Sequence, residues 1–180
     1  TIELPEPFFL FATQNPQNFV GTFPLPEAEL DRFGLSCSIG YPDPEDESRI
    51  LDLWKPGGMS RDLHAVCNAQ DILEARRTVF TIAVHAEVRE YIVQLIRSSR
   101  SHSELRLGAS PRAGIFLQQA AKTEAAMHGR SYVIPEDVET VAVPVLSHRL
   151  VLSSQARLSG TGSAELVKKM LSSIRKPTGL

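Results

Sequence analysis

The chain has 180 residues, of which 42% are hydrophobic and 22% are charged, and its net charge is −2. This composition is typical of a globular protein with one or two small domains, and the charge gives no bulk attraction for nucleic acid or anionic membranes. No apolar run reaches the ~18 residues of a membrane span, and no signal-peptide pattern is present. We therefore expect a cytoplasmic protein without a membrane span.

The first 54 residues carry the pattern of an α/β domain. The apolar run 7–13 lacks polar alternation, as in a strand that is buried on both faces of a parallel sheet. A short helix is predicted over 26–30, a second strand over 35–39, and a further helix from the capping residue Asp43. Few residues precede the first predicted strand, so we expect its neighbours to come from elsewhere and the chain to begin inside a domain.

A glycine- and proline-containing stretch, residues 55–68, is predicted to be a linker, and helical periodicity follows it. Asn68 and Asp71 resemble a capping box for a helix over 69–79. The next helix is predicted by apolar residues at positions i, i+3, i+4, i+7 and i+8. These residues are Val88, Tyr91, Ile92, Leu95 and Ile96.

Two more helices are predicted from prolines near their starts. Ser110 and Pro111 are expected to cap and open one helix, which Gly129 ends, and Pro135 opens the next. The residues expected on the inner side of the first of these helices are Ala113, Phe116, Leu117, Ala120 and Met127. Residues 69–150 are thus predicted to form an all-helical domain. The sequence pattern of the tail that follows is weak.

The cysteines and histidines show no pattern of a metal site. Cys37 and Cys67 are far apart, and we expect both to be buried free thiols, as in a reducing compartment. The histidines lack the spacing of metal ligands, so we expect no metal site from them.

Asn15 follows the first predicted strand, within Ala12-Thr13-Gln14-Asn15-Pro16. Ligands of open α/β sheets bind at this edge, and an amide that donates and accepts hydrogen bonds can orient a water there. The alternative is an Asx-turn before proline, and the residues alone favour neither interpretation.

Two arginines occupy positions suited to binding an anion. Arg32 lies at a helix end between Leu30 and Phe33, which would anchor it so that it could stabilise a transferring phosphoryl group; a surface ion pair is the alternative. Arg112 lies in the first turn of a predicted helix, where the dipole disfavours a cation but attracts an anionic ligand. For Arg112 the alternative is an ordinary exposed charge.

Six segments follow one another along the chain: ATQNP, GTFPLPEAELDRF, GYPDPE, LRLGASPRA, SYVIPEDV and VPVLSHRL. Taken in this order they resemble the MoxR family of AAA+ ATPases, and the last two resemble the lid of that family. The resemblance extends over about residues 4–150. One departure is Ile134, which stands where the family often has a capping Ser or Thr before Pro135, and we expect a weaker helix start there.

The resemblance implies an α/β fragment of an AAA+ P-loop core followed by an all-α lid, with a mostly helical chain. The implied parts are the end of the core over 1–54, the linker over 55–68, the lid over 69–150 and a C-terminal tail over 151–180.

The resemblance also implies roles for three residues. Asn15 matches sensor 1, which helps position the attacking water. Arg32 matches the arginine finger, which points into the ATP site of a neighbouring subunit. Arg112 matches sensor 2, which connects the lid position to the nucleotide state.

At the level of the whole protein, the resemblance implies ATP and Mg²⁺ as cofactors and a ring-shaped homo-oligomer, expected to be a hexamer. It also implies chaperone-like remodelling of partners, among them proteins with von Willebrand factor A domains.

These residues contain no phosphate-binding GxxxxGK[ST] loop and no acidic pair at a strand end to bind Mg²⁺. We therefore expect this chain alone not to hydrolyse ATP. The alternative is a non-catalytic paralogue or binding module that docks on an intact AAA+ subunit and supplies Arg32 in trans.

A nucleic-acid binder is a third alternative, based on Arg97, Arg100 and Arg106. Glu90 and Glu104 lie nearby in the sequence, and no aromatic residue alternates with the arginines, so we expect no nucleic-acid partner.

Overall fold

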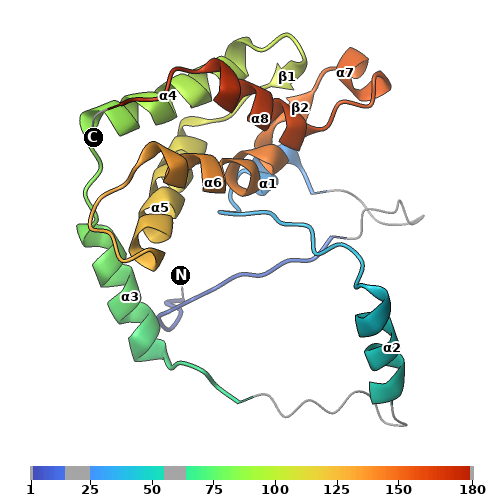
Figure 1. The fold of residues 1–180 in the computed structure, drawn as a ribbon, viewed down its shortest axis with the longest axis vertical. Coiled ribbons are helices and arrows are strands. Elements are labelled where there is room, and N and C mark those ends of the chain that lie inside the picture. Colours follow the sequence, from blue (N-terminus) through green and yellow to red (C-terminus); the bar gives the residue numbers. More distant parts are fainter. Residues whose placement is uncertain (1, 15–24, 55–63, 179–180) are drawn as a thin grey trace.

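A computed structural model describes residues 2–14, 25–54 and 64–178 of the chain (Figure 1). The helices and strands are α1 (Glu27–Leu30), α2 (Pro44–Leu53), α3 (Ala69–Thr81), α4 (Ala86–Ser101), β1 (Leu105–Leu107), α5 (Pro111–Met127), α6 (Pro135–Leu146), the 3₁₀ turn η1 (Ser147–Arg149), β2 (Val151–Leu152), α7 (Ser154–Leu158) and α8 (Ser163–Ser173). None of the helices in these ranges is long and apolar enough to cross a membrane.

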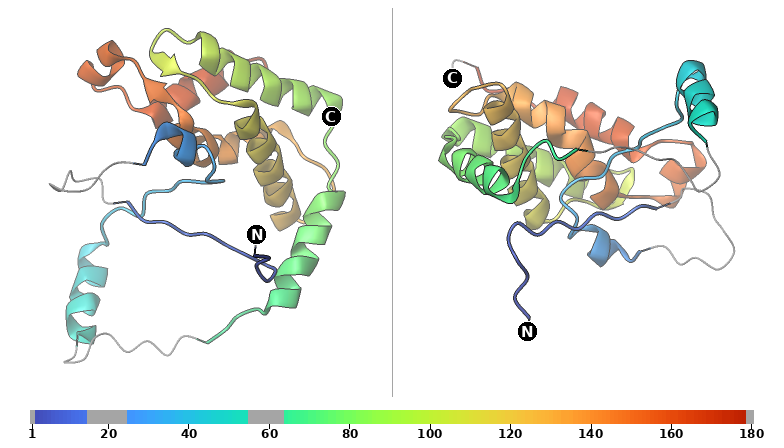
Figure 2. Two further views of the ribbon diagram at one scale, coloured as in Figure 1. Left: turned by 180° about the vertical axis from the view of Figure 1, so that it is seen from behind. Right: turned by 90° about the horizontal axis from the view of Figure 1, so that it is seen from below.

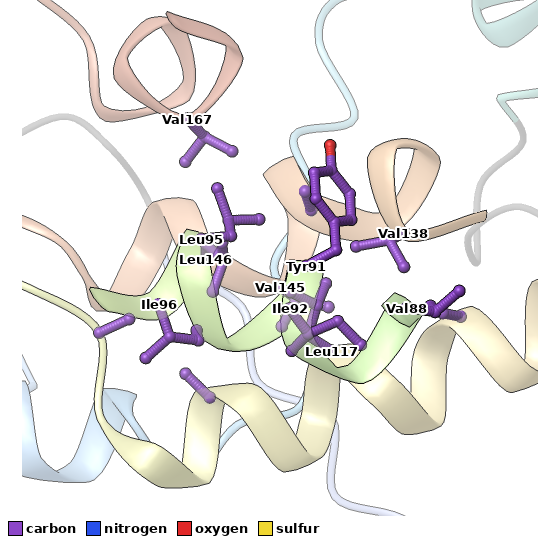
Figure 3. Packing of buried hydrophobic residues seen from close by; sticks show 14 of the residues in the cluster. Val88, Tyr91, Ile92, Leu95, Ile96, Leu117, Val138, Val145, Leu146 and Val167 are labelled. Atoms are coloured by element: carbon purple, nitrogen blue, oxygen red, sulfur yellow. The ribbon is translucent and has the colours of Figure 1, made fainter. Parts of the chain in front are cut away.

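Helices α4, α5, α6 and α8 enclose the hydrophobic core (Figure 3). All five residues predicted on the inner face of α4 are buried, which confirms that helix and its orientation. Val138, Val145 and Leu146 of α6 and Val167 of α8 pack into the same cluster. The core therefore extends beyond residue 150 and includes α8.

Helix α5 begins and ends where the sequence predicts. Ser110 accepts a hydrogen bond from the Ala113 N–H at 3.3 Å, and Gly129 follows the helix with a φ of +68°, a conformation that favours glycine. The Arg130 N–H returns to the Ala125 carbonyl at 2.9 Å and closes the end of the helix.

The predicted inner face of α5 is correct except at its last position. Ala113 and Leu117 are buried, and Phe116 and Ala120 pack partly against the core. Met127 is exposed, so its predicted place in the core is wrong. The buried residues of α5 are Ala113, Leu117, Ala121 and Ala125, and Met127 lies two positions beyond the last of them, about 200° around the helix, so its side chain is on the opposite face.

A short antiparallel ladder between β1 and β2 was not predicted within the helical region. Leu105 pairs with Leu152, and the Ser153 N–H donates to the Glu104 carbonyl at 2.8 Å. Strands of three and two residues are too short to show an alternating pattern in the sequence.

Helix α6 begins without a capping hydroxyl but does not lack a cap. The Asp137 carboxylate accepts the Ile134 N–H at 2.9 Å and is paired with the Arg130 guanidinium at 2.5 Å. This buried carboxylate at the third helical position satisfies a free N–H and lies near the positive end of the helix dipole. The expected weakness at Ile134 is therefore offset by Asp137 and Arg130.

The predicted strands over 7–13 and 35–39 are wrong for this structure. Neither segment forms a ladder, and a strand exists only through hydrogen bonds to a neighbouring strand, which no described residue supplies here. Their apolar side chains are exposed, and Phe11 reaches 89% exposure.

Helices α1, α2 and α3 bury none of their residues. Helix α2 begins at the predicted cap, where Asp43 accepts the Asp46 N–H at 2.8 Å, and it stands apart from the main helical body in every view (Figures 1 and 2). The capping box of Asn68 and Asp71 is present at the start of α3, which confirms that prediction. Helices α2 and α3 therefore begin with the capping signals that the sequence predicts. Helix α1 contacts η1 and α3 contacts α5, but neither contact buries a residue of these helices fully.

The prediction of buried cysteines is also wrong. Cys37 and Cys67 are free but exposed, because both lie in the segments without a covering layer. Among the residues that the structure describes, no group of three His, Cys, Asp or Glu side chains could hold a metal ion.

Candidate functional site

Two of the three predicted site residues lie on segments that meet at Asp31, the residue before Arg32. Arg32 is the second residue after α1, next to the C-cap residue Asp31, and Arg112 lies in the first turn of α5. Asn15 lies outside the described residues. The Arg32 and Arg112 side chains are 67% and 55% exposed, so both guanidinium groups are open to a ligand.

The nearest carboxylate to Arg32 in the described structure gives only a loose ion pair. The Arg32 guanidinium lies 3.6 Å from the Glu29 carboxylate within the same helical turn, and both groups are largely exposed. Pairs of this kind contribute little to stability, because solvent screens the charges. This contact is therefore too weak to explain Arg32 as a residue that stabilises the fold.

The carboxylate of Asp31, one residue before Arg32, joins this segment to the helical domain. Ser110 donates its hydroxyl to Asp31 at 3.0 Å while capping α5, and the Arg149 Nε donates to Asp31 at 3.1 Å. The Arg112 guanidinium lies 3.8 Å from the other Asp31 oxygen. The residue before the predicted finger thus contacts the helix that carries the predicted sensor.

Arg149 is the buried centre of this junction. Its side chain is only 1% exposed, and its guanidinium lies 4.9 Å from the centre of the Phe116 ring. Besides Asp31, it donates to the main-chain carbonyls of Phe33 and Gly34 and to Val145 in α6. Burial lowers the pKa of Arg149, whereas the Asp31 carboxylate opposes that shift, and arginine stays charged at neutral pH.

His148 adds a second contact to the same segment. Its Nε2 lies 3.1 Å from the Phe33 carbonyl, so this nitrogen carries the proton and donates it. Burial lowers the pKa of His148 despite the raising effect of that hydrogen bond. Nearby, the Ser36 N–H donates at 2.9 Å to Pro144, whose carbonyl lies in the last turn of α6.

An exposed ion pair lies at the other end of α1. The Arg106 guanidinium of β1 is hydrogen-bonded to the Glu27 carboxylate, and both side chains are about half exposed. Residues 27–36 are thus attached to the helical domain at several points. The contacts of Arg149 are the buried ones, and the contact of Arg106 is solvated.

The start of α5, and with it Arg112, is fixed by close packing against the end of α4. The Ser99 hydroxyl accepts the Ala109 N–H at 2.9 Å, and Arg100 Nε donates to the Ala109 carbonyl at 2.8 Å. A Cβ on Gly108 would lie 2.6 Å from the Ser99 carbonyl oxygen, so only glycine fits here. The loop before Arg112 therefore has one well-defined position.

Sequence reasoning located Arg32 and Arg112 but missed Asp31, Ser110 and Arg149 as partners. The signal for Arg149 is a charged residue between two apolar stretches, 143–146 and 150–152. A charge between such stretches is expected to be buried and paired. The sequence does not say which of many carboxylates is the partner.

The chemistry of this site suits an anion, but it does not complete a nucleotide site. Exposed guanidinium groups can bind phosphate oxygens, and that of Arg112 also lies at the start of α5, where the helix dipole attracts an anion. The described residues provide no carboxylate cluster for Mg²⁺. A neighbouring pocket of about 220 Å³ is lined by residues that include Glu27, Leu30, His148 and Arg157.

Two family models match the chain. Residues 97–170 match the AAA lid domain, and residues 1–35 match the ATPase family associated with various cellular activities (AAA). The matches fall on the two parts that the contacts of Asp31 join.

Known relatives match nearly the whole chain. It is 37% identical over 98% of its length to the uncharacterized protein YeaC of Bacillus subtilis, and 33% identical over 98% to the chaperone MoxR1 of Mycobacterium tuberculosis. The matched regions are 55% and 49% of those proteins, so the chain spans about half the length of these relatives.

A crystal structure of a candidate ATPase from Cytophaga hutchinsonii is similar over 97% of this chain and 56% of that one, with 30% identity and a TM-score of 0.87. This similarity confirms the expected fold, which combines a portion of an α/β AAA+ core with a helical lid. The chain belongs to the MoxR family of AAA+ ATPases, and it carries the C-terminal portion of that architecture.

Proposed function

We propose that this chain completes the ATP sites of a MoxR-type ring, in which Arg112 acts within its own subunit and Arg32 acts on the neighbouring one. The supporting observation is that both guanidinium groups are exposed although the segments carrying them are fixed to each other through Asp31. An arginine finger requires this combination of an anchored backbone and a free charged end.

In this proposal, each residue acts on a different part of ATP hydrolysis. Arg32 stabilises the charge that spreads over the transferring phosphoryl group. Arg112 binds phosphate oxygens together with the start of α5 and thereby links the lid to the bound nucleotide. Asn15 orients the attacking water.

ATP with Mg²⁺ is the proposed cofactor, and Mg²⁺ supplies charge neutralisation at the β- and γ-phosphates when it is bound. Its ligands would come from outside the described residues. The further proposals are a hexameric homo-oligomer in the cytoplasm, and remodelling of partners that include proteins with von Willebrand factor A domains. The name of the MoxR1 relative, a chaperone, supports the remodelling activity.

Steady-state ATP hydrolysis by the full-length protein tests the finger. Replacing Arg32 with Ala should lower kcat by about 10³-fold or more, with little change in nucleotide affinity. Arg112→Ala should mainly raise KM for ATP, because it removes a contact that is made to bound nucleotide. The matched control is Arg49→Ala, which removes an exposed arginine of α2 that pairs with Asp46 at 3.1 Å. Equal activities of the Arg32 and Arg49 variants would refute the proposal.

We also propose that the 180-residue chain does not hydrolyse ATP by itself, because these residues contain no phosphate-binding loop. Phosphate release should stay at the background rate with ATP and Mg²⁺. Mg²⁺-dependent release that is lost in the Arg32→Ala variant would contradict this.

A further inference from the structure

The Arg149 guanidinium binds both parts of the junction at once. On the segment that carries Arg32, it donates to the Asp31 carboxylate and to the main-chain carbonyls of Asp31, Phe33 and Gly34. On the lid it donates to the Val145 carbonyl of α6. The backbone on both sides of Arg32 is therefore attached to one side chain of the lid.

This contact differs in kind from a surface ion pair. A buried guanidinium must keep all its partners, because an unpaired buried charge is strongly destabilising. Its planar fork holds several acceptors in fixed directions, which a lysine ammonium cannot reproduce. The segment carrying Arg32 is therefore expected to follow the lid as one body rather than to slide over it.

Asp31 extends the connection to the nucleotide sensor. Its carboxylate is shared by Arg149, by the cap of α5 at Ser110 and by the Arg112 guanidinium. A shift of the start of α5 changes the position of Asp31, and Arg32 is the next residue along the chain.

We propose that Asp31 and Arg149 are positioning residues that couple the lid of one subunit to the arginine finger which that subunit presents to its neighbour. A lid movement that Arg112 induces on binding nucleotide then changes the position of Arg32 at the next site. This inference rests on the proposed function of Arg32 as a finger that acts in trans.

Mixed rings of the full-length protein test the coupling. A donor subunit has the acidic pair of its Mg²⁺ site replaced, so that it binds ATP and offers a finger but does not hydrolyse ATP itself. An acceptor subunit carries Arg32→Ala, so that it binds ATP but offers no finger. Hydrolysis in the mixture then reports on the finger that the donor supplies to the acceptor.

Placing Arg149→Lys in the donor should lower kcat of the mixture by roughly 10- to 100-fold, because a small misplacement of a catalytic group has an effect of this size. KM for ATP should change little, since the acceptor, which is the subunit that hydrolyses ATP, keeps its own Arg112 and Arg149. The same substitution in the acceptor should leave most of the activity of the mixture intact. Equal losses in the two placements, or no loss in the donor, would overturn the coupling.

Two further variants separate positioning from folding. Asp31→Asn keeps the shape of the carboxylate but removes its charge, so the donor should lose activity while it remains assembled in the ring. Arg106→Gln removes the exposed pair between the same two parts and should lower donor activity less than Arg149→Lys does. If Arg106→Gln lowered donor activity as much as Arg149→Lys does, any contact between the two parts would have the same effect, and the inference would be overturned.

The outcomes also separate this inference from the proposed function. If Arg32→Ala in every subunit leaves hydrolysis unchanged, the finger itself is disproved. If Arg32→Ala abolishes hydrolysis but Arg149→Lys and Asp31→Asn in the donor do not reduce it, only the coupling is disproved.

Discussion

The segments before residue 55 and the helices from α4 onward are both rich in apolar side chains, but they differ in how much of that surface they bury. Leu95 of α4 is 0% exposed, whereas Leu51 of α2 is 76% exposed. The core helices cover one another within the chain (Figure 3). Among the described residues, nothing of comparable extent covers 2–14 or α2.

This difference shows what a helix and a strand each need in order to be stable. An amphipathic helix forms its own hydrogen bonds and needs only a neighbour for its apolar face. A strand needs both a neighbour and a ladder, and the apolar segment 7–13 has neither here.

One part of the first region does not fit this contrast. Residues 27–36 bury little apolar surface, yet they are attached to the lid through Asp31, Phe33 and Gly34. Polar contacts to a buried arginine depend on direction, whereas apolar contacts depend mainly on area. This segment therefore has a defined position without belonging to the hydrophobic core.

The largest expected effect is on the core of the lid. Leu95→Ala should lower the free energy of unfolding by about 2–5 kcal/mol, because it leaves a cavity among fully buried side chains. Leu51→Ala makes the same chemical change at an exposed site and should change stability by less than about 0.5 kcal/mol. Urea unfolding followed by circular dichroism measures both. Similar losses would show that α2 is covered in solution and would remove the contrast.

The second prediction concerns the loop that positions Arg112. Gly108→Ala places a methyl group 2.6–2.7 Å from main-chain atoms of Ser99 and Arg100, which cannot move aside as side chains can. Overpacking of this kind should lower the free energy of unfolding by about 1–3 kcal/mol. Urea unfolding of the variant beside the unsubstituted chain measures this loss.

Gly114→Ala is the matched control within α5. Its methyl group would meet only the Ile96 side chain, at 3.5 Å, which is ordinary contact. Because alanine is the better helix former, this variant should be more stable by up to about 1 kcal/mol. If Gly108→Ala were as stable as Gly114→Ala, the close packing at Gly108 would be contradicted.

Sequence reasoning succeeded for the features that depend on interactions between residues close together in the sequence. The helix starts at Asp43, Asn68 and Ser110 were predictable, because each cap depends on residues two or three positions away. The inner face of α4 was predictable because its periodicity runs over several turns.

Other features depend on distant residues and could not be predicted. The ladder of β1 and β2 is too short to give a pattern. Met127 is apolar but lies off the row of α5 residues that the other helices cover, and only the packed structure shows which row that is. Asp31 and Arg149 are 118 positions apart, and no local rule pairs them. The two arginines Arg32 and Arg112 were found because a family motif marks them, whereas the residues that hold them in place lie in other elements.

The third prediction is a pH dependence at the junction. Burial gives folded His148 a lower pKa than the ~6.5 of an unfolded chain. Below about pH 6.5 the unfolded state therefore binds more protons, so the contribution of His148 is present above this pH and is lost as the pH falls. The fall in Tm between about pH 7.5 and 5.5 should be smaller in His148→Gln, whose amide can still donate to Phe33. An identical fall in both proteins would show that His148 is not buried in solution.

The smallest effect on global stability is expected at α3, which begins with a complete capping box but buries none of its residues. Asn68→Ala removes the side chain that accepts the N–H groups of Gln70 and Asp71 at 2.8 and 3.1 Å, at a local cost of about 1 kcal/mol. Because α3 lies outside the core, this loss should appear as faster amide hydrogen exchange over 69–81, while exchange in α4 and α6 stays unchanged. If exchange accelerated equally in α3 and α4, then α3 would unfold together with the core, and the boundary between the two regions would have to lie before residue 69.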